Sequence, residues 1–179
     1  RDHEAEGRLV IAPSYKLGDN YRLSLSNTII QNFEKERQTR LGNSKLLLSH
    51  VPIYLTNDSM LIAAGGLRLP TNVEDRHLNT YNGSLVLEPN LITNWTVFGS
   101  PFVSALGLYL TKNTHTYDRN AAGGANTSYS EMVYFGIEKE IVPKLTFLID
   151  GDYTYARTYQ NSMRTLFSMG QSLTYQHNK

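Results

Sequence analysis

The sequence predicts an all-β fold, an antiparallel up-and-down β-barrel of about eight to ten strands. Three observations lead to this prediction. Apolar and polar side chains alternate with a period of two, short turns alternate with long polar loops, and no segment carries a convincing apolar helical face. The composition agrees, because Asn, Ser and Thr make up about a quarter of the 179 residues and only 18% are charged, against roughly 25% in an ordinary soluble domain.

The whole-chain numbers also exclude several classes. A net charge of +1 gives no reason to expect a nucleic-acid partner. The absence of cysteine excludes disulfides, thiolate metal sites and a cysteine nucleophile. No apolar run approaches the roughly 20 residues of a membrane helix. We expect one domain over residues 1–179, with 1–7 a loop or tail and 176–179 a C-terminal tail; the start on Arg1 rather than Met indicates a mature protein or a fragment.

Nine segments are interpreted as strands. The alternation is clearest in 21–29, 145–155 and 167–175, whose apolar residues share one face on a strand and would spread around a helix. In 95–110, Gly99-Ser100-Pro101 interrupts the ladder and predicts a bulge or a turn. The remaining strands are predicted at 8–16, 44–55, 60–69, 84–92 and 128–140. Because single-chain bacterial barrels have an even strand number, we expect either a further strand before Arg1, for about ten in all, or about eight if one weak segment is not a strand.

The connections predict where the barrel resides. Short turns are expected at 17–20, 56–59, 93–94 and 141–144, and they alternate with long polar loops at 34–43, 70–83, 112–127 and 158–162. Outer-membrane barrels have short periplasmic turns and long external loops. The rhythm therefore predicts a transmembrane β-barrel, although lipocalin-type barrels also join strands by hairpins of mixed length.

Aromatic residues gather near the strand ends. Two interfacial girdles would produce this distribution, and so would the ordinary preference of tyrosine for strands. The girdle at the short-turn ends would contain Tyr15, Tyr21, Trp95 and Tyr175, and the one at the long-loop ends Phe33, Tyr109 and Tyr155.

The last predicted strand carries a recognisable pattern: a polar residue at Ser168, then Gly170, Leu173 and the aromatic Tyr175. It resembles the C-terminal assembly signal of bacterial outer-membrane β-barrel (porin-like) proteins. That resemblance implies a bacterial outer-membrane location, with the lipid bilayer and the barrel-assembly machinery as partners. The chain departs from the pattern in one respect, since residues 176–179 follow the final aromatic.

If the apolar stripe faces lipid, the opposite stripe lines the interior. The charged or titratable side chains projected there are Arg22, His50, Arg68, Glu88, Asp150, Asp152 and Arg164. Cross-strand pairs of Arg68 with Glu88, and of Asp150 or Asp152 with Arg164, are plausible because buried charges need partners. Such a lining either interlocks as a plug or surrounds a water-filled pore, and the small residues on this stripe favour the pore.

Signals for an enzyme are weak. Asp150 and Asp152 share a strand face, as an acid–base pair would, but no Asp, Glu and His cluster has metal-ligand spacing. Gly65-Gly66 lacks the context of a phosphate-binding loop. We therefore expect no catalytic site, metal or cofactor.

The predicted function is a passive outer-membrane channel for small polar solutes. Two alternatives stay open: a plugged barrel that serves as a membrane anchor or surface-interaction protein, and a soluble lipocalin-like carrier with its apolar stripe inside. The solute and the oligomeric state do not follow from the sequence.

Overall fold

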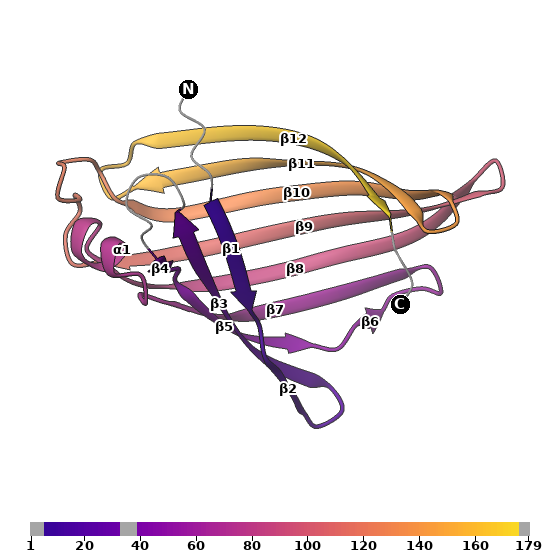
Figure 1. Cartoon of the computed structure of the whole chain (residues 1–179), viewed down its shortest axis with the longest axis horizontal. Coiled ribbons are helices and arrows are strands. Elements are labelled where there is room, and N and C mark those ends of the chain that lie inside the picture. The colour runs from indigo at the N-terminus through magenta and orange to yellow at the C-terminus, as the bar shows by residue number, and fades with distance from the viewer. Residues whose placement is uncertain (1–5, 33–38, 176–179) are drawn as a thin grey trace.

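A computed structural model describes residues 6–32 and 39–175 as one antiparallel sheet of 12 strands with one short helix (Figure 1). The strands are β1 (Glu6–Ile11), β2 (Ser14–Leu17), β3 (Tyr21–Asn32), β4 (Thr39–Leu41), β5 (Ser44–His50), β6 (Ile53–Tyr54), β7 (Ser59–Leu69), β8 (Tyr81–Val97), β9 (Ser100–His115), β10 (Thr127–Val142), β11 (Leu145–Thr158) and β12 (Met163–Tyr175); the helix is α1 (Val73–Leu78). The all-β prediction is confirmed.

The sheet follows the chain order. Its main path is β1-β3-β5-β7-β8-β9-β10-β11-β12, while β2 and β4 pair with β3, and β6 pairs with β7. Figure 1 shows α1 and the long connections at the left end of the sheet and the β8–β9 and β10–β11 hairpins at the right end. We call these the loop end and the turn end. The long connections predicted at 70–83, 112–127 and 158–162 thus lie at the opposite end of the sheet from the short turn predicted at 141–144, while most of the loop predicted at 34–43 lies outside the described residues.

Two prolines explain why the expected strands at 8–16 and 44–55 are each split. Pro13 separates β1 from β2, and Pro52 separates β5 from β6. Proline has no N–H to donate to a ladder and is therefore excluded from a continuous central strand.

The turn predicted at 93–94 does not form, and the chain turns instead at the interruption predicted at Gly99-Ser100-Pro101. β8 runs through 93–94, and the chain reverses instead at Phe98 and Gly99, which both have positive φ (50° and 76°). Positive φ at both central residues is the conformation of a type I′ hairpin turn, whose twist matches that of the flanking strands. Trp95 therefore lies at the end of β8 rather than at the start of the next strand.

The helix α1 corrects the expectation that no segment is helical. It occupies the connection between β7 and β8, and Asn72 caps it by accepting a hydrogen bond from the Asp75 N–H (3.1 Å). Its six residues are too few to produce a detectable apolar period. In the described part of the chain no helix is long and apolar enough to cross a membrane.

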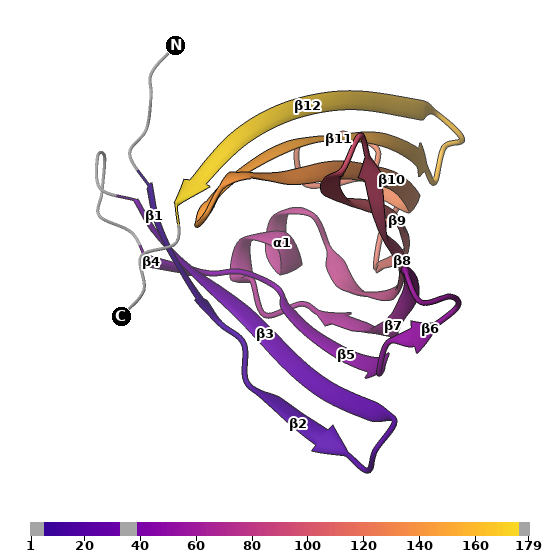
Figure 2. The same cartoon turned by 90° about the vertical axis from the view of Figure 1, so that its right-hand side faces the viewer.

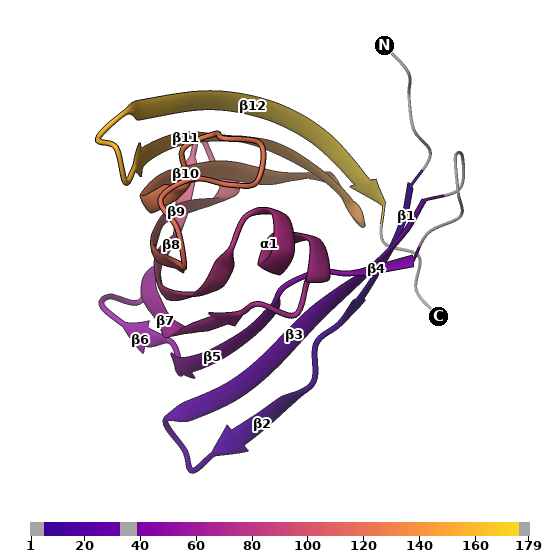
Figure 3. The same ribbon diagram turned by 90° about the vertical axis from the view of Figure 1, so that its left-hand side faces the viewer.

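The sheet is strongly curved, and α1 lies on the inner side of the curve (Figures 2 and 3). Every neighbouring pair on the main path is antiparallel, so direction reverses at each step and β1 and β12 run the same way. Among the described residues β1 and β12 do not pair with each other. They form the two edges of an open, strongly curved sheet.

Very little of the molecule is an apolar core. Among the described residues, only Tyr81 and Val86 are buried hydrophobic side chains, and both belong to β8. Large apolar side chains instead lie exposed along the convex face, such as Leu85 at 62% and Met169 at 64%. Exposed apolar side chains therefore lie mainly on the convex face, while the concave face mixes polar residues with apolar ones such as Val86.

Candidate functional site on the concave face

The strand register sorts the predicted interior charges onto the two faces of the sheet. Arg22 of β3 pairs with Ser49 of β5, which pairs with Ala64 of β7. Ala64 in turn pairs with Glu88 of β8, so all four residues share one face. The same face continues across β9 to β12. It carries six of the predicted residues: Arg22, Arg68, Glu88, Asp150, Asp152 and Arg164. This is the concave face, because Arg68 and Arg164 both line a cavity together with Asp75 of α1.

His50 is the exception, and its predicted position in the interior is wrong. The register places it opposite Tyr21, on the convex face, with the two rings 5.0 Å apart. Because β5 and β6 are separated at Pro52, the alternation could not be projected through this segment as one strand.

The ion pair on this face differs from the one expected. Arg68 lies opposite Ser84, whereas Glu88 lies opposite Ala64, so the two are four residues out of register. Glu88 instead pairs with Lys45 of β5, with side chains only 13% and 25% exposed. The pair bridges β7 next to Gly66, which has no side chain to obstruct it. Lys45 was missed, although its alternation with Leu47 and Ser49 would have identified it.

The carboxylates of β11 also find other partners than Arg164. Asp152 accepts one hydrogen bond from the Ser168 hydroxyl and another from the Thr154 hydroxyl (3.4 Å). Asp150 lies beside Gly170, where a Cβ atom would be 3.1 Å from its Oδ1. Arg164 lies opposite Ala156, nearer the loop end. Ser168 and Gly170 of the predicted assembly signal thus accommodate the two aspartates, while Leu173 and Tyr175 project from the convex face, 60% and 64% exposed.

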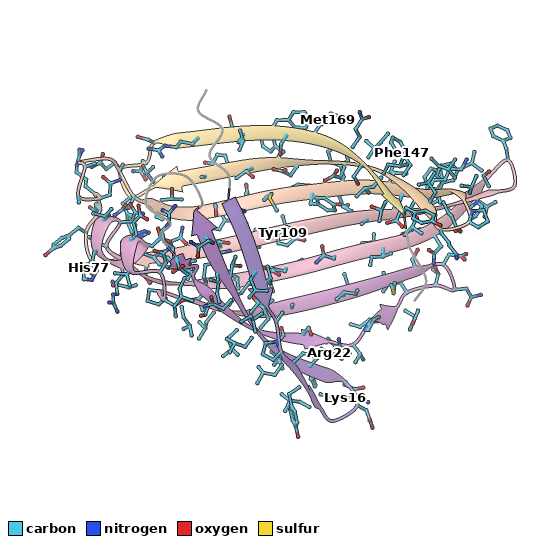
Figure 4. The ribbon with its side chains drawn as sticks, in the orientation of Figure 1. Lys16, Arg22, His77, Tyr109, Phe147 and Met169 are labelled. Carbon is cyan, nitrogen blue, oxygen red and sulfur yellow. The ribbon has the colours of Figure 1, made fainter. Side chains whose placement is uncertain are left out.

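The predicted girdle residues are distributed as follows. Five lie on the convex face near the ends of their strands: Tyr15, Tyr21, Trp95, Tyr155 and Tyr175. Tyr109 does not, because it lies near the middle of the sheet on the concave face, where its hydroxyl donates to Asn90 Oδ1 (3.4 Å; Figure 4). Phe33 lies outside the described residues.

The turn end of the convex face has an aromatic cluster that includes two residues not predicted. Trp95 stacks on Phe102 with ring centroids 5.0 Å apart, and the Lys139 ammonium lies 4.9 Å from the Phe102 centroid. Stacked rings beside a cation suit a boundary between an apolar and an aqueous medium.

The loop end of the concave face has a polar cavity of about 300 Å³. Helix α1 and the 116–126 connection line it and are joined by hydrogen bonds from the Ala121 N–H to the Leu78 carbonyl (2.7 Å) and from the Asn126 amide to the Asn79 carbonyl (3.0 Å). Desolvation lowers the pKa of His115 in the wall of this cavity, opposed by the Asp75 charge. Burial therefore favours the uncharged form of the ring.

Chemically, the concave face can hydrate and attract small polar solutes, and its charges are held in place by the sheet. No group of three or more His, Asp or Glu side chains in the described ranges is arranged to hold a metal ion. No protein-family model matches the sequence, and no curated protein matches it.

Proposed function

We propose that this protein is a bacterial outer-membrane β-barrel that acts as a passive channel for small polar solutes. The single observation that carries the proposal is the distribution of side chains between the two faces. The convex face is largely apolar and exposed, the concave face is mixed and carries the six predicted charged residues, and only Tyr81 and Val86 are buried hydrophobic residues in the described chain.

A soluble protein of this kind would be anomalous. Soluble monomers rarely expose contiguous apolar patches beyond a few hundred Å², whereas here the outward residues of five consecutive strands are largely apolar. On β12 alone, Phe167, Met169 and Leu173 are each more than half exposed. The same distribution counts against a soluble lipocalin-like carrier, which would need the apolar stripe on the concave face.

The apolar band has the height of a membrane. On β9 the outward residues from Phe102 to Leu110 are mostly apolar, and Lys112 ends the band at the loop end. At about 3.3 Å per residue the span from Phe102 to Lys112 is about 33 Å along the strand. A strand tilt of about 40° reduces this to about 25 Å across the bilayer, the thickness of the apolar band in outer-membrane barrels.

In hydrocarbon the edges of the sheet must be satisfied, because an unpaired backbone group there costs several kcal/mol. Since β1 and β12 run in the same direction, an antiparallel closure requires one further strand between them. This agrees with the sequence-based expectation of about ten strands.

Transport would be diffusion down a gradient. The polar wall replaces part of the hydration of the solute, and α1 with the 116–126 connection narrows the passage at the loop end. Arg22 near the turn end and Asp150 and Asp152 on β11 would set the charge preference together with the loop-end arginines.

The test is ion conductance of the detergent-refolded chain in a planar lipid bilayer with unequal salt on the two sides. Discrete current steps would support a channel, and the reversal potential would give the sign of the preferred ion. A matched control is the same preparation after heat denaturation, which should be silent.

The position of α1 on the inner side of the curve favours one alternative, a plugged barrel that anchors surface loops. Insertion confirmed by protection of the strands from protease, together with a silent bilayer, would reject the channel and leave this alternative.

A further inference from the structure

The loop-end cavity combines residues from six parts of the chain that are far apart in sequence. Arg68 comes from β7, Asp75 from α1, His115 from β9 and Arg164 from β12. Asn43 and Asn126 contribute from the connections before β5 and β10. A cavity assembled by this many elements holds its polar groups in fixed relative positions.

The charges around the cavity favour an anion. Two guanidinium groups and one carboxylate line it, and among the described residues no carboxylate lies within 4 Å of either guanidinium. The Asp75 carboxylate is already occupied: its two oxygens accept hydrogen bonds from the amides of Asn43 (2.6 Å) and Asn79 (3.0 Å). The excess hydrogen-bonding capacity of the cavity is therefore cationic.

The asparagine side chains in the cavity wall donate hydrogen bonds to the surrounding backbone. The Asn126 amide donates to the carbonyls of Asn79 and Tyr117, and the Asn113 amide donates to the Thr127 carbonyl (3.1 Å). His115 differs, because its Nδ1 is buried and has no hydrogen-bond partner in the described chain. Its ring is held between Tyr81 and Tyr159, with centroids 5.6 Å from each. Because Nδ1 is out of contact with solvent, it is not offered to a ligand, and His115 contributes to the cavity wall only.

We infer that this cavity binds a small oxyanion, the phosphate or carboxylate group of a solute, between the guanidinium groups of Arg68 and Arg164 beside His115. The inference rests on the proposed function, because it gives the channel a solute class and a binding position at its loop end. Guanidinium groups bind carboxylate and phosphate through paired N–H donors.

The test is equilibrium binding to the full, detergent-refolded chain, measured by calorimetry at low salt with inorganic phosphate, succinate and, as a neutral probe, glycerol. We expect saturable binding of phosphate, succinate or both, with the probe that saturates identifying the oxyanion, and no binding of glycerol. Arg164→Gln should weaken binding about tenfold, the loss of one charge-assisted hydrogen bond, and Arg68→Gln with Arg164→Gln should abolish saturation.

Arg157→Gln is the matched control. Arg157 of β11 pairs with Met163, the residue next to Arg164 on β12, but projects from the convex face. Its substitution should therefore leave binding unchanged. All of β12 is exposed, so Arg164→Gln leaves the fold intact. Failure of both anions to saturate, or equal weakening by Arg157→Gln, would overturn the inference. A conducting channel without anion binding would reject this inference alone, whereas binding by a silent protein would reject the channel alone.

Discussion

The two halves of the sheet are built differently. In the C-terminal half, β8 to β12 are unbroken strands of 13 to 17 residues. In the N-terminal half, β1, β2, β4, β5 and β6 have between two and seven residues, and only β3 and β7, with 12 and 11, are of comparable length. A strand needs about 9–11 residues to cross a bilayer, so in the proposed membrane setting every C-terminal strand is long enough, whereas in the N-terminal half only β3 and β7 are.

Proline has opposite consequences in the two halves. Pro13 and Pro52 each end a strand, but β8 continues through Pro89. Pro89 keeps its position opposite Ala63 of β7, while the pairing with β9 is interrupted between Leu87 and Asn90. Long neighbours on both sides hold β8 in place over this gap. Strand continuity is thus a property of the surrounding sheet as well as of the strand's own residues.

The largest effect should come from the strand where the halves meet. A Cβ on Gly66 of β7 would lie 1.9 Å from the Leu46 carbonyl oxygen, so Gly66→Ala forces β5 away from β7. We expect the free energy of unfolding to fall by about 3 kcal/mol, measured by urea unfolding in detergent.

Gly65→Ala is the control for that prediction. At Gly65 the nearest atom to an added Cβ is 3.6 Å away, an ordinary contact. Equal stability losses for the two variants would contradict the close approach of β5 at Gly66.

The Lys45–Glu88 pair should produce the next largest effect, because it ties the two halves together across β7. Lys45→Met leaves a largely buried carboxylate without its cation, and we expect a loss of about 2 kcal/mol in the free energy of unfolding. A double-mutant cycle with Glu88→Gln measures the coupling. The exposed pair Lys16–Asp19 (3.6 Å) in the β2–β3 hairpin is the comparison, and Lys16→Met should have no measurable effect.

Sequence reasoning succeeded where the alternation is regular. The strands at 145–155 and 167–175, and the common face of Asp150, Asp152 and Arg164, follow directly from a period of two. It failed at His50 and at the turn predicted at 93–94, which forms five residues later at Phe98-Gly99, where the glycine had indicated a bulge or a turn.

Pairing partners could not be predicted either. Which cation reaches Glu88 depends on the register between β5, β7 and β8, and a side chain as long as that of Lys45 reaches beyond its direct neighbour. The cavity beneath α1 depends on a six-residue helix that has no periodic signal. The Asn-rich connections indicated only a polar loop.

A smaller effect is expected on the ion selectivity of the proposed channel, which charge reversals in the two halves should shift in opposite directions. Asp150→Arg on β11 replaces an anion on the concave wall by a cation, and Arg22→Glu on β3 does the reverse. One charge at contact distance in water is worth about 1 kcal/mol, which corresponds to about a fivefold change in local ion concentration. Asp150→Arg should therefore shift the reversal potential toward anion preference and Arg22→Glu toward cation preference. If both shift it in the same direction, these residues do not line the conducting path.

The smallest effect concerns pH and the loop end. Desolvation in the cavity lowers the pKa of His115 from its ordinary value of 6.5, so the unfolded chain takes up this proton at a higher pH than the folded chain. Folding stability from this residue is complete above the unfolded pKa and is lost as pH falls through the folded pKa. Between about pH 7.5 and about pH 5.5, the wild type should lose slightly more free energy of unfolding than His115→Asn, as measured by urea midpoints in detergent. The difference should be smaller than that expected for the uptake of one full proton.

His77→Asn, on α1 outside the cavity (Figure 4), controls for loss of an imidazole at the same end of the sheet. An identical pH dependence for wild type and His115→Asn would mean that water reaches the ring.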